Sequence, residues 1–249
     1  MERRLLEMSW CDALFAHWPV APETVAETLP EGVSVATYDG DAWLGIVAFV
    51  MEDIRPRGVP VGLTFGEANL RTYVTGPDGT DGIYFYNLDA EDPLGVYVAR
   101  GVYDLPYYRA EMSVERRSNG DGDGDGNGNR GFDDPDGGTV RFLSNRTHPG
   151  VPAAHLDCTY GPTSDPRQPE PGSLESFLVE NYRFYTEGGD GLYYGDVAHE
   201  PWPLCDADCD LRSTTFFEAN GFDAPDGDPL VHYSPGVDVG ADRIRRLAR

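Results

Sequence analysis

The chain contains no lysine: all 19 of its cationic side chains are arginine, in a sequence of 249 residues. Enzymes that bind a carbonyl substrate or pyridoxal phosphate as an imine need a side-chain amine. Only the N-terminal amine could take that role here, and nothing in the sequence indicates that it does. The absence of lysine therefore excludes Schiff-base chemistry at a side chain, and no cofactor is predicted.

Long hydrophobic runs, a disulfide framework and the common catalytic motifs are also missing. The longest apolar run, residues 42–51, is too short to cross a bilayer and is typical of a strand buried on both faces. The N-terminus does not resemble a signal peptide, and four cysteines in a chain of this length do not make a disulfide scaffold. No G-x-S-x-G, Walker or H-E-x-x-H sequence occurs. We therefore predict a cytoplasmic protein that does not bind membranes.

Negative charge is in large excess. The sequence has 43 Asp and Glu residues against 19 Arg, which gives a net charge of −24. Such a surface repels itself at low ionic strength and is tolerated when salt screens it. We predict a protein of a halophile that binds neither nucleic acid nor anionic lipid. The alternative is an ordinary acidic protein from an arginine-rich genome.

Alternating hydrophobic patterns and turn residues predict a mainly β chain with a few short helices. No linker divides the sequence, so we predict a single domain of residues 1–249, with a disordered acidic loop at 118–138 and an arginine-rich tail at 240–249. Strands are expected at 8–18, 33–38, 42–50, in both arms of 67–88, and at 106–117, 139–147, 153–160, 191–199, 204–211 and 229–239. Helices are expected at 22–29, 93–103, between Ser173 and Gly188, and at 213–220.

Three local patterns imitate binding sites but lack the required context. The G-x-G-x-x-G sequence at 126–131 follows no apolar strand and opens no helix. The aspartates of 121–125 begin like an EF-hand loop, but Phe132 stands where a bidentate glutamate is needed. Cys205 and Cys209 lie on one face of an alternating strand, about 13 Å apart, which is too far for a disulfide or a shared metal. No metal site is predicted.

The hairpin of residues 67–88 carries the most informative polar residue, Arg71. On a strand, Glu67, Asn69, Arg71 and Tyr73 share one face, and the alternate residues suit a core. An arginine that points inward needs a planar anionic partner. Glu67 could supply it as a structural ion pair, or could act as an acid or base beside a ligand carboxylate held by Arg71. The alternation alone does not choose between these two roles.

Nine short segments spread over most of the chain form a recognisable set. They are MSW at 8–10, FAHWPV at 15–20, PEG at 30–32, DGDAW at 39–43, RPRG at 55–58, NLRTYV at 69–74, LPY at 105–107, GSLESFL at 172–178 with Tyr182, and HEPWPL at 199–204. Together they resemble the YqjF-like family of uncharacterised proteins (domain of unknown function 2071), within the acetoacetate decarboxylase-like superfamily. The resemblance implies a closed or strongly curved antiparallel β-barrel with a few peripheral helices and an interior pocket. Decarboxylases of that superfamily use a catalytic lysine, which this chain lacks, so decarboxylation through an imine is not expected.

These observations predict a protein that binds a small organic acid or carbonyl compound, with Arg71 as the anchor of the carboxylate. If it is an enzyme, acid/base chemistry of the lyase or hydratase type through Glu67 is expected. The alternatives are a non-catalytic binding protein and a structural or oligomeric protein with a filled interior; a homodimer is compatible with the sequence. The further candidates for the pocket wall are Asn69, Tyr73, Tyr86, Tyr107, His199 and Trp202.

Overall fold

Thirteen strands form one continuous mixed sheet in the computed structural model, which describes residues 5–91, 105–117, 138–188 and 191–247. The predicted helix at 93–103 and nearly all of the acidic segment at 118–138 lie outside these residues. The helices are α1 (Pro22–Ala26), α3 (Leu174–Val179) and α4 (Phe216–Ala219). The strands are β1 (Leu6–Val20), β2 (Ser34–Val35), β3 (Ala42–Pro56), β4 (Leu63–Thr75), β5 (Asp81–Ala90), β6 (Tyr107–Arg117), β7 (Thr139–Arg146), β8 (His155–Pro162), β9 (Arg183–Gly188), β10 (Gly191–Ala198), β11 (Cys205–Thr214), β12 (Leu230–Ala241) and β13 (Arg245–Arg246).

The sheet closes on itself as a barrel. Strands β5, β6, β7, β8, β11, β12, β1, β3 and β4 are hydrogen-bonded in that order, and the pairing of β4 with β5 completes the ring. The closed barrel is therefore confirmed. It is mixed rather than purely antiparallel, because β5 runs parallel to β6 and also to β9.

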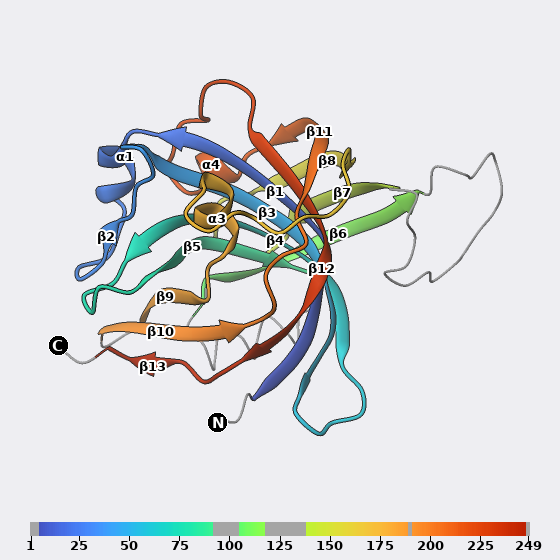
Figure 1. Ribbon diagram of the computed structural model, residues 1–249, viewed down its shortest axis with the longest axis horizontal. Helices are drawn as coiled ribbons and strands as arrows, with labels where there is room; N and C mark the ends of the chain where they lie inside the picture. The colour runs from blue at the N-terminus through green and yellow to red at the C-terminus, as the bar shows by residue number, and fades with distance from the viewer. Residues whose placement is uncertain (1–4, 92–104, 118–137, 189–190, 248–249) are drawn as a thin grey trace.

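A second, smaller ring shares five strands with the barrel. Strand β10 pairs with β12, and β9 pairs with β5, so β12, β1, β3, β4 and β5 are closed a second time by β9 and β10. In Figure 1, α3 lies over the middle of the molecule, above the shared strands. The shared strands therefore have the barrel interior on one face and the smaller ring on the other.

The apolar run 42–51 predicted a strand that is buried on both faces. Strand β3 is such a strand because it belongs to both rings. Within residues 42–51 of β3, even-numbered positions contribute to one hydrophobic cluster, the α4-side core, and odd-numbered positions to another, the α3-side core. Members of the α3-side core are Phe15, Trp43, Val47, Phe49, Phe65, Tyr73, Leu178, Val179, Phe184 and Trp202. Members of the α4-side core are Leu14, Ala16, Trp18, Leu44, Ile46, Leu70, Phe142, Leu156, Tyr160, Phe216 and Phe217.

Two predicted elements differ in the structure. The helix expected up to Gly188 ends at Val179, and 183–188 form β9, because the first half of β5 needs a partner and this segment is rich in β-favouring aromatic residues. The strand expected at 33–38 is shorter: only Ser34–Val35 form β2, which pairs with the edge of β4. Among the described residues no helix is long and apolar enough to cross a membrane.

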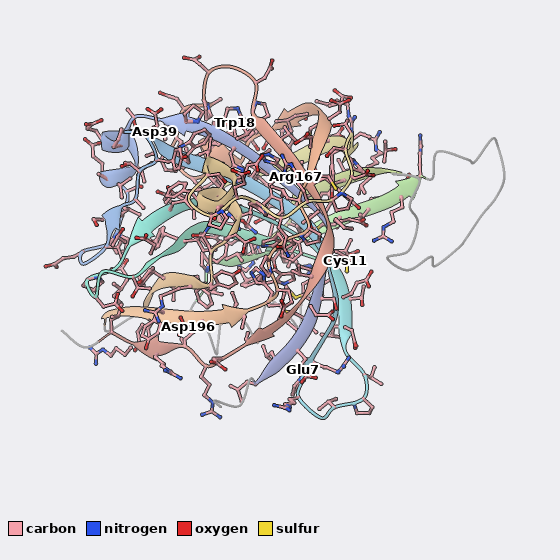
Figure 2. The ribbon with its side chains drawn as sticks, in the orientation of Figure 1. Glu7, Cys11, Trp18, Asp39, Arg167 and Asp196 are labelled. Atoms are coloured by element: carbon pink, nitrogen blue, oxygen red, sulfur yellow. The ribbon has the colours of Figure 1, made fainter. Side chains whose placement is uncertain are left out.

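The two ends of the strand β3 differ in exposure. Its final residues extend with β4 into a hairpin that projects from the barrel (Figure 1). Glu7 on β1 lies beside this hairpin (Figure 2), where its carboxylate is 3.9 Å from Arg55 and 3.6 Å from Arg57. These partly exposed pairs contribute little to stability. The functional argument therefore concerns the buried half of β3 and β4.

Candidate functional site

The polar face of β4 is buried, not solvated. Glu67, Asn69, Arg71 and Tyr73 are each less than a tenth exposed and face the α3-side core, while Ala68, Leu70, Thr72 and Val74 are fully buried on the other face. The predicted division of β4 into two faces is thus seen in the structure. The four polar residues are arranged as two groups, one around Arg71 and one around Glu67.

Arg71 is a buried cation whose guanidinium does not lie within 4 Å of any carboxylate of the described residues. One nitrogen, Nη2, donates to the backbone oxygen of Leu178 at 3.0 Å. The guanidinium carbon lies 5.6 Å from the ring centre of Phe15 and 5.8 Å from that of Tyr73. Its Nε has no hydrogen-bond partner. The hydrogen bond to the last turn of α3 uses one of the five N–H groups of Arg71. It does not compensate the positive charge of the guanidinium.

The ion pair between Glu67 and Arg71 that the sequence left open does not form. Glu67 is hydrogen-bonded to Tyr107, and Arg71 to Leu178. Residues four apart on one strand are separated by about 13 Å. The spacing that keeps Cys205 apart from Cys209 therefore also keeps Glu67 apart from Arg71.

Glu67 forms the second polar group. The hydroxyl of Tyr107 donates to its carboxylate at 2.7 Å. Burial raises the pKa of Glu67 to about 7, against the opposing effects of Tyr107 and Asn69. A carboxyl group with such a pKa exchanges protons near neutral pH, as an acid/base residue requires.

His17, which the sequence did not indicate as a site residue, contacts the Arg71 group. Its Nε2 lies 2.7 Å from the hydroxyl of Tyr73, and that hydroxyl lies 2.9 Å from the Leu178 oxygen. Burial and the nearby charge of Arg71 hold the pKa of His17 well below its usual range, so the imidazole is neutral. The sequence does show that His17 is two residues from Phe15 on one strand and so shares its face. The arrangement of β1, β3 and β4 was needed to show that this face contacts Arg71.

Gly45 makes room for His17 and Tyr73. In the sheet Gly45 of β3 pairs with His17 of β1 on one side and with Arg71 of β4 on the other. A Cβ atom at Gly45 would be 2.6 Å from Cδ2 and 2.9 Å from Nε2 of His17. Only a residue without a side chain lets the imidazole lie across β3 toward Tyr73.

We therefore expect Gly45→Ala to lower the free energy of unfolding by about 1–3 kcal/mol, as overpacking of a core does. Urea unfolding in molar potassium chloride measures this. Gly66→Ala on β4 is the matched control: its Cβ would meet the Met112 sulfur at 3.0 Å, and a flexible methionine can shift. Equal losses in the two variants would contradict the account of Gly45.

Aromatic rings form the wall next to Arg71. Trp202 packs on Phe15 with ring centres 5.1 Å apart and on His199 at 5.3 Å, so both predicted wall residues are in this group. Burial and, more weakly, Arg71 lower the pKa of His199. Tyr86 lies elsewhere, against Phe222 and hydrogen-bonded to Thr28. Buried polar atoms without a partner on this side of the sheet include Trp10 Nε1, His17 Nδ1, Trp43 Nε1, Asn69 Oδ1, Arg71 Nε, His199 Nε2 and His232 Nδ1.

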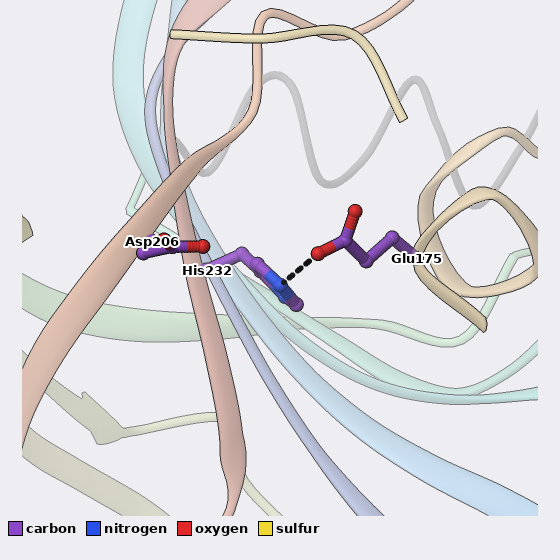
Figure 3. A group of neighbouring side chains, drawn as sticks. All are labelled: Glu175, Asp206 and His232. Atoms are coloured by element: carbon purple, nitrogen blue, oxygen red, sulfur yellow. Dashed lines mark hydrogen bonds and ion pairs between the residues drawn. The ribbon is translucent and has the colours of Figure 1, made fainter. Parts of the chain in front are cut away.

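Helix α3 covers the Arg71 group and is held at its start by a charged cluster. Figure 3 shows Glu175 of α3 facing His232 of β12, 3.3 Å from its Nε2, with Asp206 of β11 beside them. The ligand atoms of these three residues lie within 4.8 Å of one another, a spacing that suits a metal. However, Arg167 donates to Glu175 at 2.7 Å and to Asp206 at 2.8 Å. The guanidinium of Arg167 already pairs with both carboxylates, so we interpret the cluster as an ion-pair network that fixes α3.

A cavity of about 340 Å³ opens beside α3. Tyr73 and Phe177 form part of its wall, together with Tyr38, Ser176 and Glu180. This volume is at the lower end of the range for small-molecule sites. The cavity reaches the ring of Tyr73, and this ring contacts Arg71. Arg71 and His17 are not among the residues that line this cavity.

Residues 7–238 match the family of uncharacterized conserved proteins called domain of unknown function 2071. The chain belongs to this family. It is 37% identical over 238 residues to the uncharacterized protein YqjF of Bacillus subtilis (strain 168), covering 94% of this chain and 89% of YqjF. The resemblance to this family that the sequence showed is thus confirmed.

Solved structures of the acetoacetate decarboxylase type share the fold of this family member. The enduracididine biosynthesis enzyme MppR, complexed with pyruvate, superposes with a TM-score of 0.61 at 12% identity, covering 100% of this chain and 92% of MppR. Acetoacetate decarboxylase of Legionella pneumophila gives 0.60 at 9% identity, covering 98% and 87%. At such identities the likeness shows the fold alone.

Proposed function

We propose that this protein binds a small carboxylate, in particular an organic acid that also carries an oxygen on the neighbouring carbon, under α3, with Arg71 as its anchor. The observation that carries the proposal is the buried guanidinium of Arg71, which has an unpartnered Nε and no carboxylate within 4 Å among the described residues. A buried charge without a partner is costly, and a bidentate carboxylate is the partner that a guanidinium fits best. The pyruvate complex of the similarly folded MppR supports this class of ligand.

The surroundings of Arg71 favour an anion. The two neighbouring imidazoles, His17 and His199, are kept neutral by burial, so they do not add a charge of their own. The rings of Phe15 and Trp202 exclude water, which strengthens the attraction between the guanidinium and a carboxylate. Binding of a carboxylate would supply the missing countercharge.

Acid/base chemistry on the bound acid is the second part of the proposal. No lysine is present to form an imine, so protons must be moved by groups that titrate or hydrogen-bond. Glu67, with its raised pKa, is one such group, and it lies farther along β4 from the anchor. A reaction of the lyase or hydratase type would therefore need a ligand long enough to reach from Arg71 toward Glu67.

The test is a thermal-shift measurement in molar potassium chloride with pyruvate, lactate, propionate and succinate. An acid present at a hundred times its dissociation constant should raise the Tm by about 5–10 °C in a chain of this size. Arg71→Met should abolish the shift, because the anchor is lost. Arg57→Met, which removes an exposed guanidinium, should leave it intact. No shift with any acid in the wild type, or an equal shift in Arg71→Met, would contradict the proposal.

A further inference from the structure

Three aromatic side chains line the cavity beside α3. Phe177 of α3 contacts both of the others: its ring centre lies 5.0 Å from that of Tyr73 on β4 and 5.7 Å from that of Tyr38, which precedes β3. The ring planes are tilted by 41° and 45°, so the rings do not stack flat on one another. Groups of aromatic rings of this kind bind organic cations in proteins, because the face of each ring carries partial negative charge.

The polar groups of the same wall direct their donors away from the cavity. The hydroxyl of Tyr73 donates to a backbone oxygen at 2.9 Å, and that of Tyr38 to another at 3.3 Å. The side-chain amide of Asn181 donates to a backbone oxygen at 3.0 Å. A phenol has a single proton, so neither tyrosine has a donor left for a ligand. An anion depends on donors that point toward it, and these side chains therefore suit it poorly.

Two carboxylates also line the cavity. Asp81, at the start of β5, is exposed, and Glu180, directly after α3, is half-buried. Asp81 accepts from the hydroxyl of Thr75 at 2.6 Å and Glu180 from the backbone N–H of Trp202 at 2.9 Å, which holds both groups in place. Neither carboxylate forms an ion pair with any described residue, and no arginine or histidine is part of the cavity wall.

The charges behind the wall do not reverse this balance. The guanidinium carbon of Arg71 lies 5.8 Å from the ring centre of Tyr73, so its charge opposes a cation in the cavity. Burial lowers the pKa of His199, which lies near enough to feel the charge of Glu180, so this imidazole is neutral. Two carboxylates on the wall against one arginine outside it leave the cavity negative.

We propose that the cavity beside α3 binds a small alkylated ammonium ion, which packs on the rings of Tyr38, Tyr73 and Phe177 and is attracted by Asp81 and Glu180. This site is separate from the carboxylate site proposed at Arg71 and does not depend on it. The volume of about 340 Å³ suits a small ion. Alkyl groups on the nitrogen favour binding over that of bare ammonium, because such a nitrogen loses fewer hydrogen bonds on leaving water.

The experiment compares a cation with its neutral analogue by calorimetry in molar potassium chloride. The probes are tetramethylammonium, choline and 3,3-dimethylbutan-1-ol, the uncharged carbon analogue of choline. Molar salt screens the general attraction of cations to a protein of net charge −24. The wild type should bind choline at least about tenfold more tightly than the alcohol. Equal affinities for the two, or binding of neither cation, would overturn the inference.

Variants of the wall place the cation. Phe177→Leu keeps an apolar side chain but removes the ring, and should weaken choline binding about tenfold. Glu180→Gln should weaken it up to about fivefold, and keeps the test decisive if Phe177→Leu does not fold. Phe85→Leu, which removes a half-buried ring of the same core outside the wall, should bind as the wild type does. Arg71→Met should bind choline at least as tightly. Unchanged affinity in Glu180→Gln and in folded Phe177→Leu, or weaker binding in Arg71→Met, would overturn the inference.

Discussion

Replacing Arg146 with methionine is expected to lower the free energy of unfolding by about 3–5 kcal/mol, the cost of leaving one partner of a buried ion pair alone. Arg146 on β7 and Asp89 on β5 are both buried, and Nε and Nη2 of the arginine lie 2.9 and 2.8 Å from one carboxylate oxygen. Burial already raises the pKa of Asp89 to about 6, against the effect of Arg146. Without Arg146, the carboxylate would have to become protonated or remain buried as an uncompensated charge.

Urea unfolding of Arg146→Met at pH 7 and pH 5 in molar potassium chloride measures this cost. The loss should be smaller at pH 5, where a neutral Asp89 no longer needs a countercharge. Arg71→Met is the matched comparison, because it also removes a buried guanidinium from a strand but orphans no carboxylate of the described residues. We expect its stability to stay within about 1 kcal/mol of the wild type, the worth of one hydrogen bond. Equal losses in the two variants would show that Arg71 has a structural countercharge after all.

The fold could largely be predicted from the sequence because each local pattern agreed with the global arrangement. Alternation in β4 and the apolar run of β3 identified strands with two buried faces, and the turn residues placed most of the other strands. The sequence could not show that β5 divides its free edge between β6 and β9. Because the first half of β5 pairs with residues 183–188, these residues form a strand, although the local hydrophobic periodicity favoured a longer helix.

The candidate site was predictable in part for the same reason. Arg71 and Tyr73 follow from alternation within one strand, which a sequence displays directly. His17 depends on the register of β1 against β3 and on the absence of a side chain at Gly45, and neither is visible before the strands are paired. The Leu178 oxygen is a backbone group, and no sequence pattern specifies where it will point. The separation of Glu67 from Arg71, by contrast, was already contained in their spacing.

Replacing Glu67 with glutamine is expected to change the pH dependence of stability more than any other single carboxyl substitution in the site. Burial raises the pKa of Glu67 to about 7 from its usual 4.5. Between these values the unfolded chain releases its proton while the folded protein keeps it, so the wild type loses stability as the pH rises from 4.5 to 7. This difference between the pKa values of Glu67 in the folded and unfolded states corresponds to a loss of about 3 kcal/mol in the free energy of unfolding. The full loss is reached above pH 7.

Glutamine stays neutral and can still accept from the Tyr107 hydroxyl. The variant should therefore match the wild type near pH 4.5 and exceed it by up to about 3 kcal/mol at pH 8. Urea unfolding across this range measures the difference, and Glu111→Gln, which removes an exposed carboxylate on β6, controls for the loss of one negative charge. A difference that does not vary with pH would show that Glu67 is ionised in the folded protein throughout this range. It would then lack the proton that general acid catalysis requires, so the general-acid role of Glu67 in the proposed function would fail, while the carboxylate anchor at Arg71 stayed in place.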